Sequence, residues 1–284
     1  MFQSLTLLRK YRYQFTFISM VSALLTSAIT FAQVGTEQVP LTNFEYATKI
    51  TDTAVDMNQA TANTDPLDSP YPVPWNWVLD SHAQLTANGK SGLSYYRSPS
   101  LISPDGQYAA YSRIKMQAEP ELFRSNVTSV MFMENLQTGD LMTINPSSPL
   151  ANNTWYNEQE NILPGAIAIL IPVSWSEDGE RILSRQFEGI FSTSEASDYA
   201  VVWDRNNNQT STITPQVDHT NAVLLGWSGN SPEHILFRAG ILGDEEWPMW
   251  AVNLDGDTAL AGNDLPQIYG QYMNPIWSGP QAMW

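Results

Sequence analysis

The stretch SLISPDGQYAAYSRI, residues 100–114, places a turn between two runs of strand-forming residues. In Ser103-Pro104-Asp105-Gly106, proline holds the second turn position, where its fixed φ suits a type I turn. Glycine holds the last position, where a positive φ costs it little. The stretch therefore predicts a β-hairpin whose tight turn ends at Gly106.

The same pattern returns along the chain. The segments VSWSEDGERILSRQF and LGWSGNSPEHILFRA align with it, so that Trp-Ser at 175–176 and at 227–228 matches Ile-Ser at 102–103. A fourth copy, PIWSGPQAMW, begins with Trp-Ser at 277–278. The serines are spaced by 73, 52 and 50 positions, and a turn-rich insertion, NPSSPLANNTWYNEQENILPG, lengthens the first interval.

A second hairpin follows in each of the first three copies. Strand, polar turn and strand are visible in SVMFMENLQTGDLMTI, YAVVWDRNNNQTSTIT and PMWAVNLDGDTAL. Two hairpins per copy predict a four-stranded antiparallel sheet, and a period near 50 residues is typical of propeller blades. The predicted fold is therefore all-β, a β-propeller of about four four-stranded antiparallel blades over residues 98–284.

The units SPDGQYAAYSRI and FMENLQTGD resemble the WD-like repeats of TolB-type propellers. Those repeats are similar to the repeats in the N-terminal propellers of dipeptidyl-peptidase IV and prolyl oligopeptidase relatives. The resemblance implies a propeller over residues 98–284, but it carries no partner-binding residue to this chain. TolB-type proteins also imply six blades and a preceding α/β domain, whereas residues 33–97 show no α/β pattern.

The first residues have the order of a secretory signal. Basic Arg9, Lys10 and Arg12 precede an apolar run over 15–31, and small residues end at Ala32. We expect residues 1–32 to be a signal peptide that is removed on export to the periplasm or the extracellular space. An uncleaved membrane anchor is the alternative.

Two further segments separate this signal from the repeats. Residues 33–70 are rich in Thr, Asn, Asp and Ala, so we expect a disordered spacer. Residues 71–97 contain Trp75 and Trp77, which favour docking on the propeller. We expect PWNWVLDSHAQLT to pack on the C-terminal copy or add a strand to it, and to bury Trp75 and Trp77 with Trp277.

Composition limits the function. The formal net charge of −16 disfavours nucleic acid and anionic lipid as partners, and we expect no stable membrane insertion after signal cleavage. The absence of cysteine excludes disulfides, thiol nucleophiles and cysteine metal sites. An exported chain without disulfides favours a bacterial envelope.

No linear motif names a reaction. The pattern G-x-S-x-G is absent, and His82, His219 and His234 lack the spacing of a metal site. The segment DRNNNQTSTITP lacks the glycine and glutamate of a calcium loop. We therefore predict no catalytic residue, no metal and no cofactor.

The loop GILGDEEWPMW, residues 240–250, is the predicted ligand site. Carboxylates beside an exposed indole can hold a cation or a sugar ring. The loop has three carboxylates and two indoles: Asp244, Glu245, Glu246, Trp247 and Trp250. The alternative is a solvated loop that its tryptophans anchor. YPVPWNW and NNTWYNEQE are further aromatic segments with potential to bind glycans.

Together these features predict an exported, non-catalytic platform that binds an envelope protein or a glycan. The alternative is an enzyme, a hydrolase or lyase, whose site is built from scattered Asp, Glu and His at the central channel. A purely structural envelope protein is a third possibility. Converging carboxylates or histidines would favour the enzyme, and a lining of hydrophobic and hydroxyl groups would favour the platform.

Overall fold

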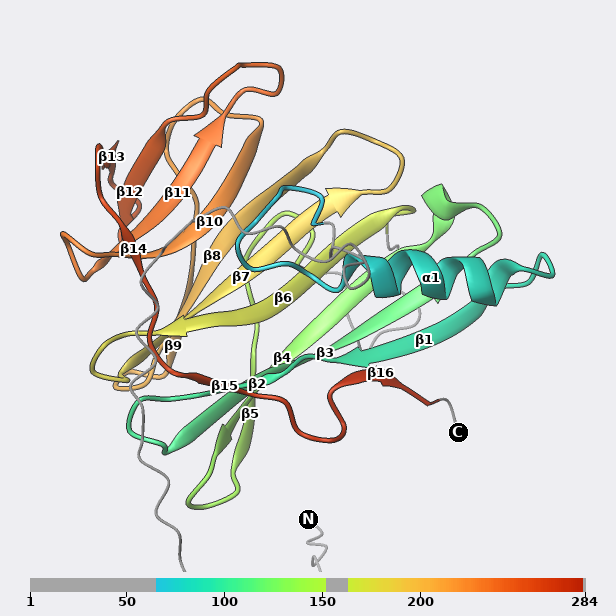
Figure 1. Cartoon of the computed structure of the whole chain (residues 1–284), viewed down its shortest axis with the longest axis horizontal. Helices are drawn as coiled ribbons and strands as arrows, with labels where there is room; N and C mark the ends of the chain where they lie inside the picture. The colour runs from blue at the N-terminus through green and yellow to red at the C-terminus, as the bar shows by residue number, and fades with distance from the viewer. Residues whose placement is uncertain (1–64, 152–162, 283–284) are drawn as a thin grey trace, which may run out of the picture. The chain divides into compact units, whose positions relative to one another are not determined.

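Strands dominate the computed structural model, which describes residues 65–151 and 163–282 (Figure 1). The predicted all-β class is confirmed. The helices within these ranges are α1 (Trp75–Thr86) and a short 3-10 turn (Leu122–Arg124), and none is long and apolar enough to span a bilayer. The predicted signal peptide, residues 1–32, and residues 33–64 of the predicted spacer lie outside the described residues.

Twelve strands form three four-stranded antiparallel meanders, in which each strand pairs with the next. The first meander comprises β2 (Ser100–Ile102), β3 (Tyr108–Ala118), β4 (Asn126–Asn135) and β5 (Leu141–Ile144). The second comprises β6 (Ala166–Trp175), β7 (Arg181–Ile190), β8 (Ala196–Asp204) and β9 (Gln209–Ile213). The third comprises β10 (Asn221–Ser228), β11 (His234–Gly240), β12 (Met249–Asn253) and β13 (Thr258–Leu260). The hairpins predicted from the repeats are thus confirmed.

The predicted turn chemistry is confirmed too. Gly106 has φ +67° and its N–H donates to the carbonyl of Ser103 at 2.9 Å. Gly179 has φ +74° and makes the same bond to Ser176 at 3.0 Å. A positive φ strains most residues with a Cβ, so glycine is favoured at both turns.

The meanders join into two sheets. A short parallel pairing of β4 with β6 links the first two meanders, and three further strands, described below, complete an 11-stranded sheet. The third meander forms a 5-stranded sheet with β14 (Pro266–Gln267). All ten positions of β6 are buried, as expected for a strand that other elements cover on both faces. Three buried apolar clusters fill the space around these strands.

One C-terminal segment, residues 264–273, crosses the first strand of every meander (Figure 1). β14 pairs with β10, Tyr269 forms a bridge with Trp175 of β6, and β15 (Gln271–Met273) pairs with β2. Since an uncovered strand edge invites aggregation, this segment protects the edges of all three first strands.

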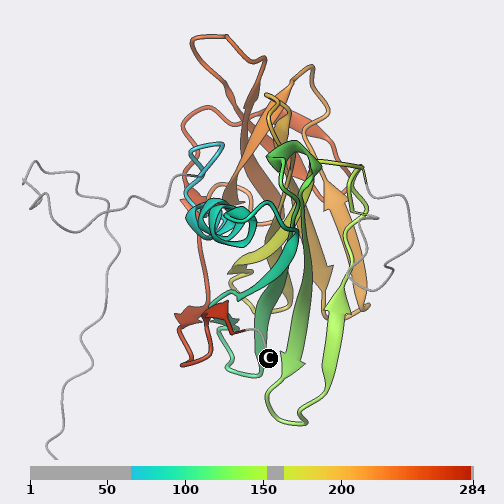
Figure 2. The ribbon, with the colours of Figure 1, turned by 90° about the vertical axis from the view of Figure 1, so that its right-hand side faces the viewer.

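Helix α1 begins directly after Pro74, a residue that fits a helix start because the first turn needs no N–H partner. It lies on one face of the large sheet, with Val78 fully buried against it (Figure 2). β1 (Gly92–Arg97) follows and pairs with both β3 and β16 (Gly279–Gln281). Residues 71–97 therefore meet the C-terminal stretch through β1.

The expected joint burial of three tryptophans is wrong. Trp75 packs on Phe187 and Phe191, whereas Trp277 lies in the turn before β16 and is 59% exposed. PWNWVLDSHAQLT forms α1 and adds no strand, because β1 supplies the strand. Among the described residues the Trp-Ser pair at 277–278 begins no meander, because Trp277 lies in a turn and the strand that follows, β16, pairs with β1.

Candidate functional site

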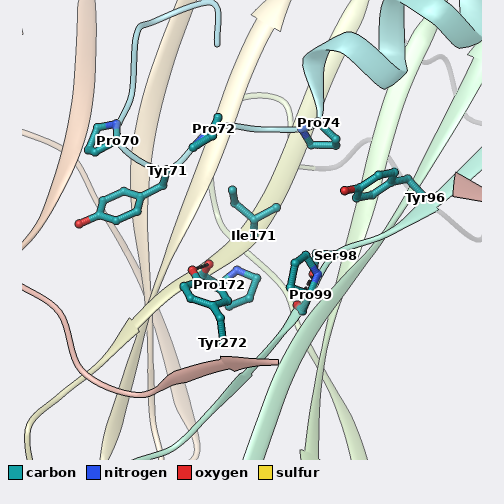
Figure 3. A pocket seen from close by; sticks show the side chains of 10 residues that line it. All are labelled: Pro70, Tyr71, Pro72, Pro74, Tyr96, Ser98, Pro99, Ile171, Pro172 and Tyr272. Carbon is teal, nitrogen blue, oxygen red and sulfur yellow. Dashed lines mark hydrogen bonds between the residues drawn. The ribbon is translucent and has the colours of Figure 1, made fainter. Parts of the chain in front are cut away.

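A cavity of about 240 Å³ lies where four segments distant in sequence meet (Figure 3). One wall is the stretch before α1, a second is the junction of β1 with β2, the floor is β6, and the last wall is β15. The lining is five prolines, three tyrosines, one isoleucine and one serine: Pro70, Tyr71, Pro72, Pro74, Tyr96, Ser98, Pro99, Ile171, Pro172 and Tyr272. We call it the proline-tyrosine pocket.

Two of its tyrosines are fixed by their hydroxyl groups. Tyr71 donates to the carbonyl of Leu225 at 2.7 Å, and Tyr272 donates to the carbonyl of Pro172 at 2.8 Å. The hydroxyl of Tyr96 has no hydrogen bond among the described residues and points toward the space over Ile171 (Figure 3). The pocket therefore offers a ligand one phenolic donor.

The local sequence of β6 explains its floor. Pro172 has no N–H to give to the sheet, and the pairing of β6 with β7 shifts register between Pro172 and Ser174. The displaced strand presents the Pro172 ring to the cavity and its carbonyl to Tyr272. A proline in a buried strand thus creates part of the pocket.

A buried ionic network holds the wall before α1. Arg185 of β7 is fully buried and donates from Nη1 to the carbonyl of Tyr71 at 2.7 Å. The same guanidinium binds both oxygens of Asp65, at 2.6 and 3.1 Å, and Asp198 at 2.7 Å. Asp65 in turn accepts the N–H of Val73 at 3.0 Å. Residues 65–73, which include the end of the predicted spacer, are therefore clamped to the sheet.

The network contains two carboxylates and one cation. Burial raises the pKa of Asp198 to about 6, despite the neighbouring guanidinium. Burial also opposes the charge of Asp65, but hydrogen bonds and attraction from Arg185, with backbone N–H groups, hold its pKa below the usual value. Asp65 is the better solvated anion of the pair because it accepts more hydrogen bonds.

The tyrosines of the pocket cannot act as bases near neutral pH. Burial raises the pKa of Tyr71, and the nearby Tyr272 raises it further. Burial also raises the pKa of Tyr272 and of Tyr96. The described residues that line the pocket include no carboxylate or histidine, the groups most often suited to general acid–base chemistry.

The loop predicted from sequence has a different character. Asp244, Glu245 and Glu246 are exposed. Trp247 donates from Nε1 to the carbonyl of Ile241 at 3.1 Å, and Trp250 donates to that of Ala239 at 3.2 Å. Both indoles therefore use their N–H groups to anchor the loop. The glycan or cation site there stays a prediction.

Two other kinds of candidate site are a metal site and a cavity lined by Arg181. Among residues 65–151 and 163–282, no group of three or more His, Asp or Glu could hold a metal ion. A cavity of about 410 Å³ between the meander turns is lined by Arg181, but that cation pairs with Asp204 at 2.8 Å and Glu233 at 3.5 Å. Acidic residues outnumber this one cation, since Glu177 and Asp178 line the same cavity, so Arg181 is not free to bind an anion.

Sequence reasoning found only one wall of the proline-tyrosine pocket. YPVPWNW was recognised as an aromatic segment, and it supplies Tyr71, Pro72 and Pro74. Pro172 and Tyr272 were missed because they lie in other segments. A proline inside the apolar run AIAILIPVSW was the available signal.

No family model matches the chain, and no curated protein matches it. The TolB-type resemblance therefore stays a prediction from the repeats.

Proposed function

We propose that this chain is an exported, non-catalytic binding platform of a bacterial envelope, and that its three meanders are blades of a TolB-like propeller. The earlier count of about four blades included the Trp-Ser pair at 277–278, which begins no meander. The repeats and their Ser-Asp turns support the blade assignment. The order of basic, apolar and small residues over 1–32 supports export.

The proline-tyrosine pocket is the proposed binding site, and its occupant is an uncharged, extended, proline-containing segment of a partner protein. Its lining carries this proposal. Proline rings pack well on tyrosine faces, and extended proline-rich segments dock in aromatic grooves. The unused hydroxyl of Tyr96 matches a backbone carbonyl of such a segment.

The pocket suits a peptide better than a glycan. A sugar needs several polar side chains for its hydroxyl groups, yet Ser98 already donates to the carbonyl of Pro99 and accepts the N–H of Ser112. The hydroxyls of Tyr71 and Tyr272 are likewise engaged. The absence of an acid or base from the lining favours binding over the alternative hydrolase or lyase.

A titration tests the proposal. The probes are an acetylated proline decapeptide and a tetramer of N-acetylglucosamine, and the reporter is the fluorescence of Trp77, whose ring lies 5.3 Å from that of Tyr96. We expect the peptide to bind. Tyr96→Ala should weaken binding about tenfold or more, and Tyr96→Phe by less, because it removes only the hydrogen bond.

Tyr111→Phe is the matched control, since Tyr111 lies on the same sheet, stacked on Phe132, and does not line the pocket. It should bind the peptide as the wild type does. Binding of the sugar alone would replace the peptide with a glycan as ligand. Binding of neither probe, or equal loss in the control, would overturn the proposed site.

A further inference from the structure

A second cavity, of about 410 Å³, lies at the end of β7 and the start of β8. Its walls are mainly apolar and include Leu150, Ile190, Ala196 and Leu242. The lining also includes two carboxylates, Glu188 and Glu195, and the first of them is buried. Glu188 is a carboxylate on β7 that is only 5% exposed.

The hydrogen bonds of Glu188 come from neutral donors. Its Oε1 accepts the hydroxyl of Ser148 at 2.5 Å and the amide of Gln186 at 3.0 Å. Among the described residues, its Oε2 accepts one hydrogen bond, from the N–H of Leu150 at 3.0 Å. Since a carboxylate oxygen has two acceptor positions, Oε2 retains one for a further donor.

No cation neutralises this carboxylate within the part of the chain that the structure describes. None of the ion pairs there includes Glu188. Residues 152–162 contain no lysine, arginine or histidine in their sequence. A buried charge without a counterion costs free energy that neutral hydrogen bonds offset only in part.

A buried oxygen next to Glu188 also lacks a hydrogen-bond donor among the described residues. Oε1 of Gln186 is buried and accepts no hydrogen bond among the described residues. Tyr199 pairs with Gln186 on the adjacent strand and lines the same cavity as Glu188. Glu195 lies at the exposed rim of the cavity. An aromatic face beside carboxylates is the setting in which proteins bind organic cations.

We propose that this cavity binds the ammonium group of a small organic amine, with Glu188 as its counterion and Tyr199 as an aromatic wall. The apolar remainder of the cavity accommodates the carbon chain of the amine. An ammonium ion is favoured over a metal ion because no cluster of three ligating side chains exists among the described residues. The acidic chain, with a net charge of −16, attracts such cations. This site is separate from the proline-tyrosine pocket.

Three probes of one shape test the charge requirement. Hexylammonium, hexanol and hexanoate are unbranched six-carbon molecules whose head groups are cationic, neutral and anionic. By calorimetry on the full chain, hexylammonium should bind at least about tenfold more tightly than hexanol, and hexanoate should not bind. Equal binding of hexylammonium and hexanol to the wild type would overturn the proposal, with no need of any variant.

Two variants then locate the charge. Glu188→Gln keeps the shape of the side chain and should reduce hexylammonium binding about tenfold, to the level of hexanol. Glu195→Gln, at the rim, should reduce it by less than about threefold, because solvent screens an exposed charge. Equal losses in the two variants would indicate general attraction to an acidic surface and would overturn the assignment to Glu188.

Discussion

Ser228 donates a hydrogen bond of 2.5 Å to Asp264, which lies 36 positions later in the chain. The two residues are almost fully buried, at 3% and 5% exposure. Oδ1 of Asp264 also accepts the N–H groups of Gly229, Asn230 and Leu265. One carboxylate therefore fixes both the turn after β10 and the start of segment 264–273.

In the first two meanders the turn itself supplies the carboxylate that accepts the serine hydroxyl. Their turn serines donate to Asp105 and Asp178, each two positions on, at 2.5 Å. In the third meander that position is Asn230, and Asp264 supplies the carboxylate from the C-terminal segment. A Ser–Asp hydrogen bond is thus present in all three meanders. In the third meander its carboxylate, Asp264, also anchors the segment that crosses all three.

Asp264→Ala should destabilise the protein by about 2–4 kcal/mol, because it leaves several buried donors without an acceptor. Urea unfolding followed by tryptophan fluorescence measures the change. Asp255→Ala is the control, since Asp255 is exposed and its carboxylate makes no contact of this kind; it should cost less than about 0.5 kcal/mol. Similar midpoints for the two variants would contradict the anchoring role of Asp264.

Two truncations test the crossing segment as a whole. A chain that ends at Met273 keeps β14, the bridge of Tyr269 and β15, and loses the three-pair contact of β16 with β1. A chain that ends at Ala261 loses all four. We expect the first to melt within about 5 °C of the full chain, and the second to melt more than about 10 °C lower. Equal melting temperatures would show that the first strands do not depend on this segment.

Local features of the fold could be predicted from sequence, because neighbouring residues determine them. The turns at Gly106 and Gly179 follow from their own four residues. The clamp at Asp65 has no such local signal: its partner Arg185 lies 120 positions away, and the surrounding composition is that of a spacer. A charged residue inside the buried strand RILSRQFEGI indicated only that some partner had to exist.

The repeated Trp-Ser pair was misleading for a spatial reason. At 175–176 and 227–228 the pair ends a strand that the C-terminal segment can reach. At 277–278 the same two residues follow that segment and lie outside any strand, and the strand after them, β16, pairs with β1. The proline-tyrosine pocket was equally hidden, since its walls assemble only when residues 70–74 and Tyr272 meet over β6.

Gly106→Val should cost about 1–3 kcal/mol in the free energy of unfolding, because a β-branched residue is strained at a φ of +67°. Nothing lies within 4 Å of the place that a Cβ would take, so the cost is conformational and not a clash. Gly106→Asn should cost clearly less, since asparagine tolerates the left-handed region. If valine and asparagine had equal effects on the urea midpoint, backbone strain would not be the cause.

The buried network gives stability a pH dependence that one residue controls. In the folded protein the pKa of Asp198 is raised to about 6, against about 3.9 in an unfolded chain. Between about pH 4 and pH 6 the folded state therefore holds a proton that the unfolded state has released. The stability from this group is fully present below about pH 4, decreases as the pH rises to about 6, and is constant above that, a total change of about 2–3 kcal/mol.

Asp198→Asn removes this titration while retaining an acceptor for Arg185. Urea unfolding of both proteins from pH 4.5 to 7.5 should show the stability of the wild type falling relative to the variant as the pH rises to about 6, and a constant difference beyond. The range stays above the lowered pKa of Asp65, whose contribution has the opposite sign and is lost only as the pH falls below about 4. Asp255→Asn should follow the wild type throughout. Parallel curves for wild type and Asp198→Asn would mean that Arg185 keeps both carboxylates ionised over the whole range, and that the clamp on residues 65–73 does not respond to pH.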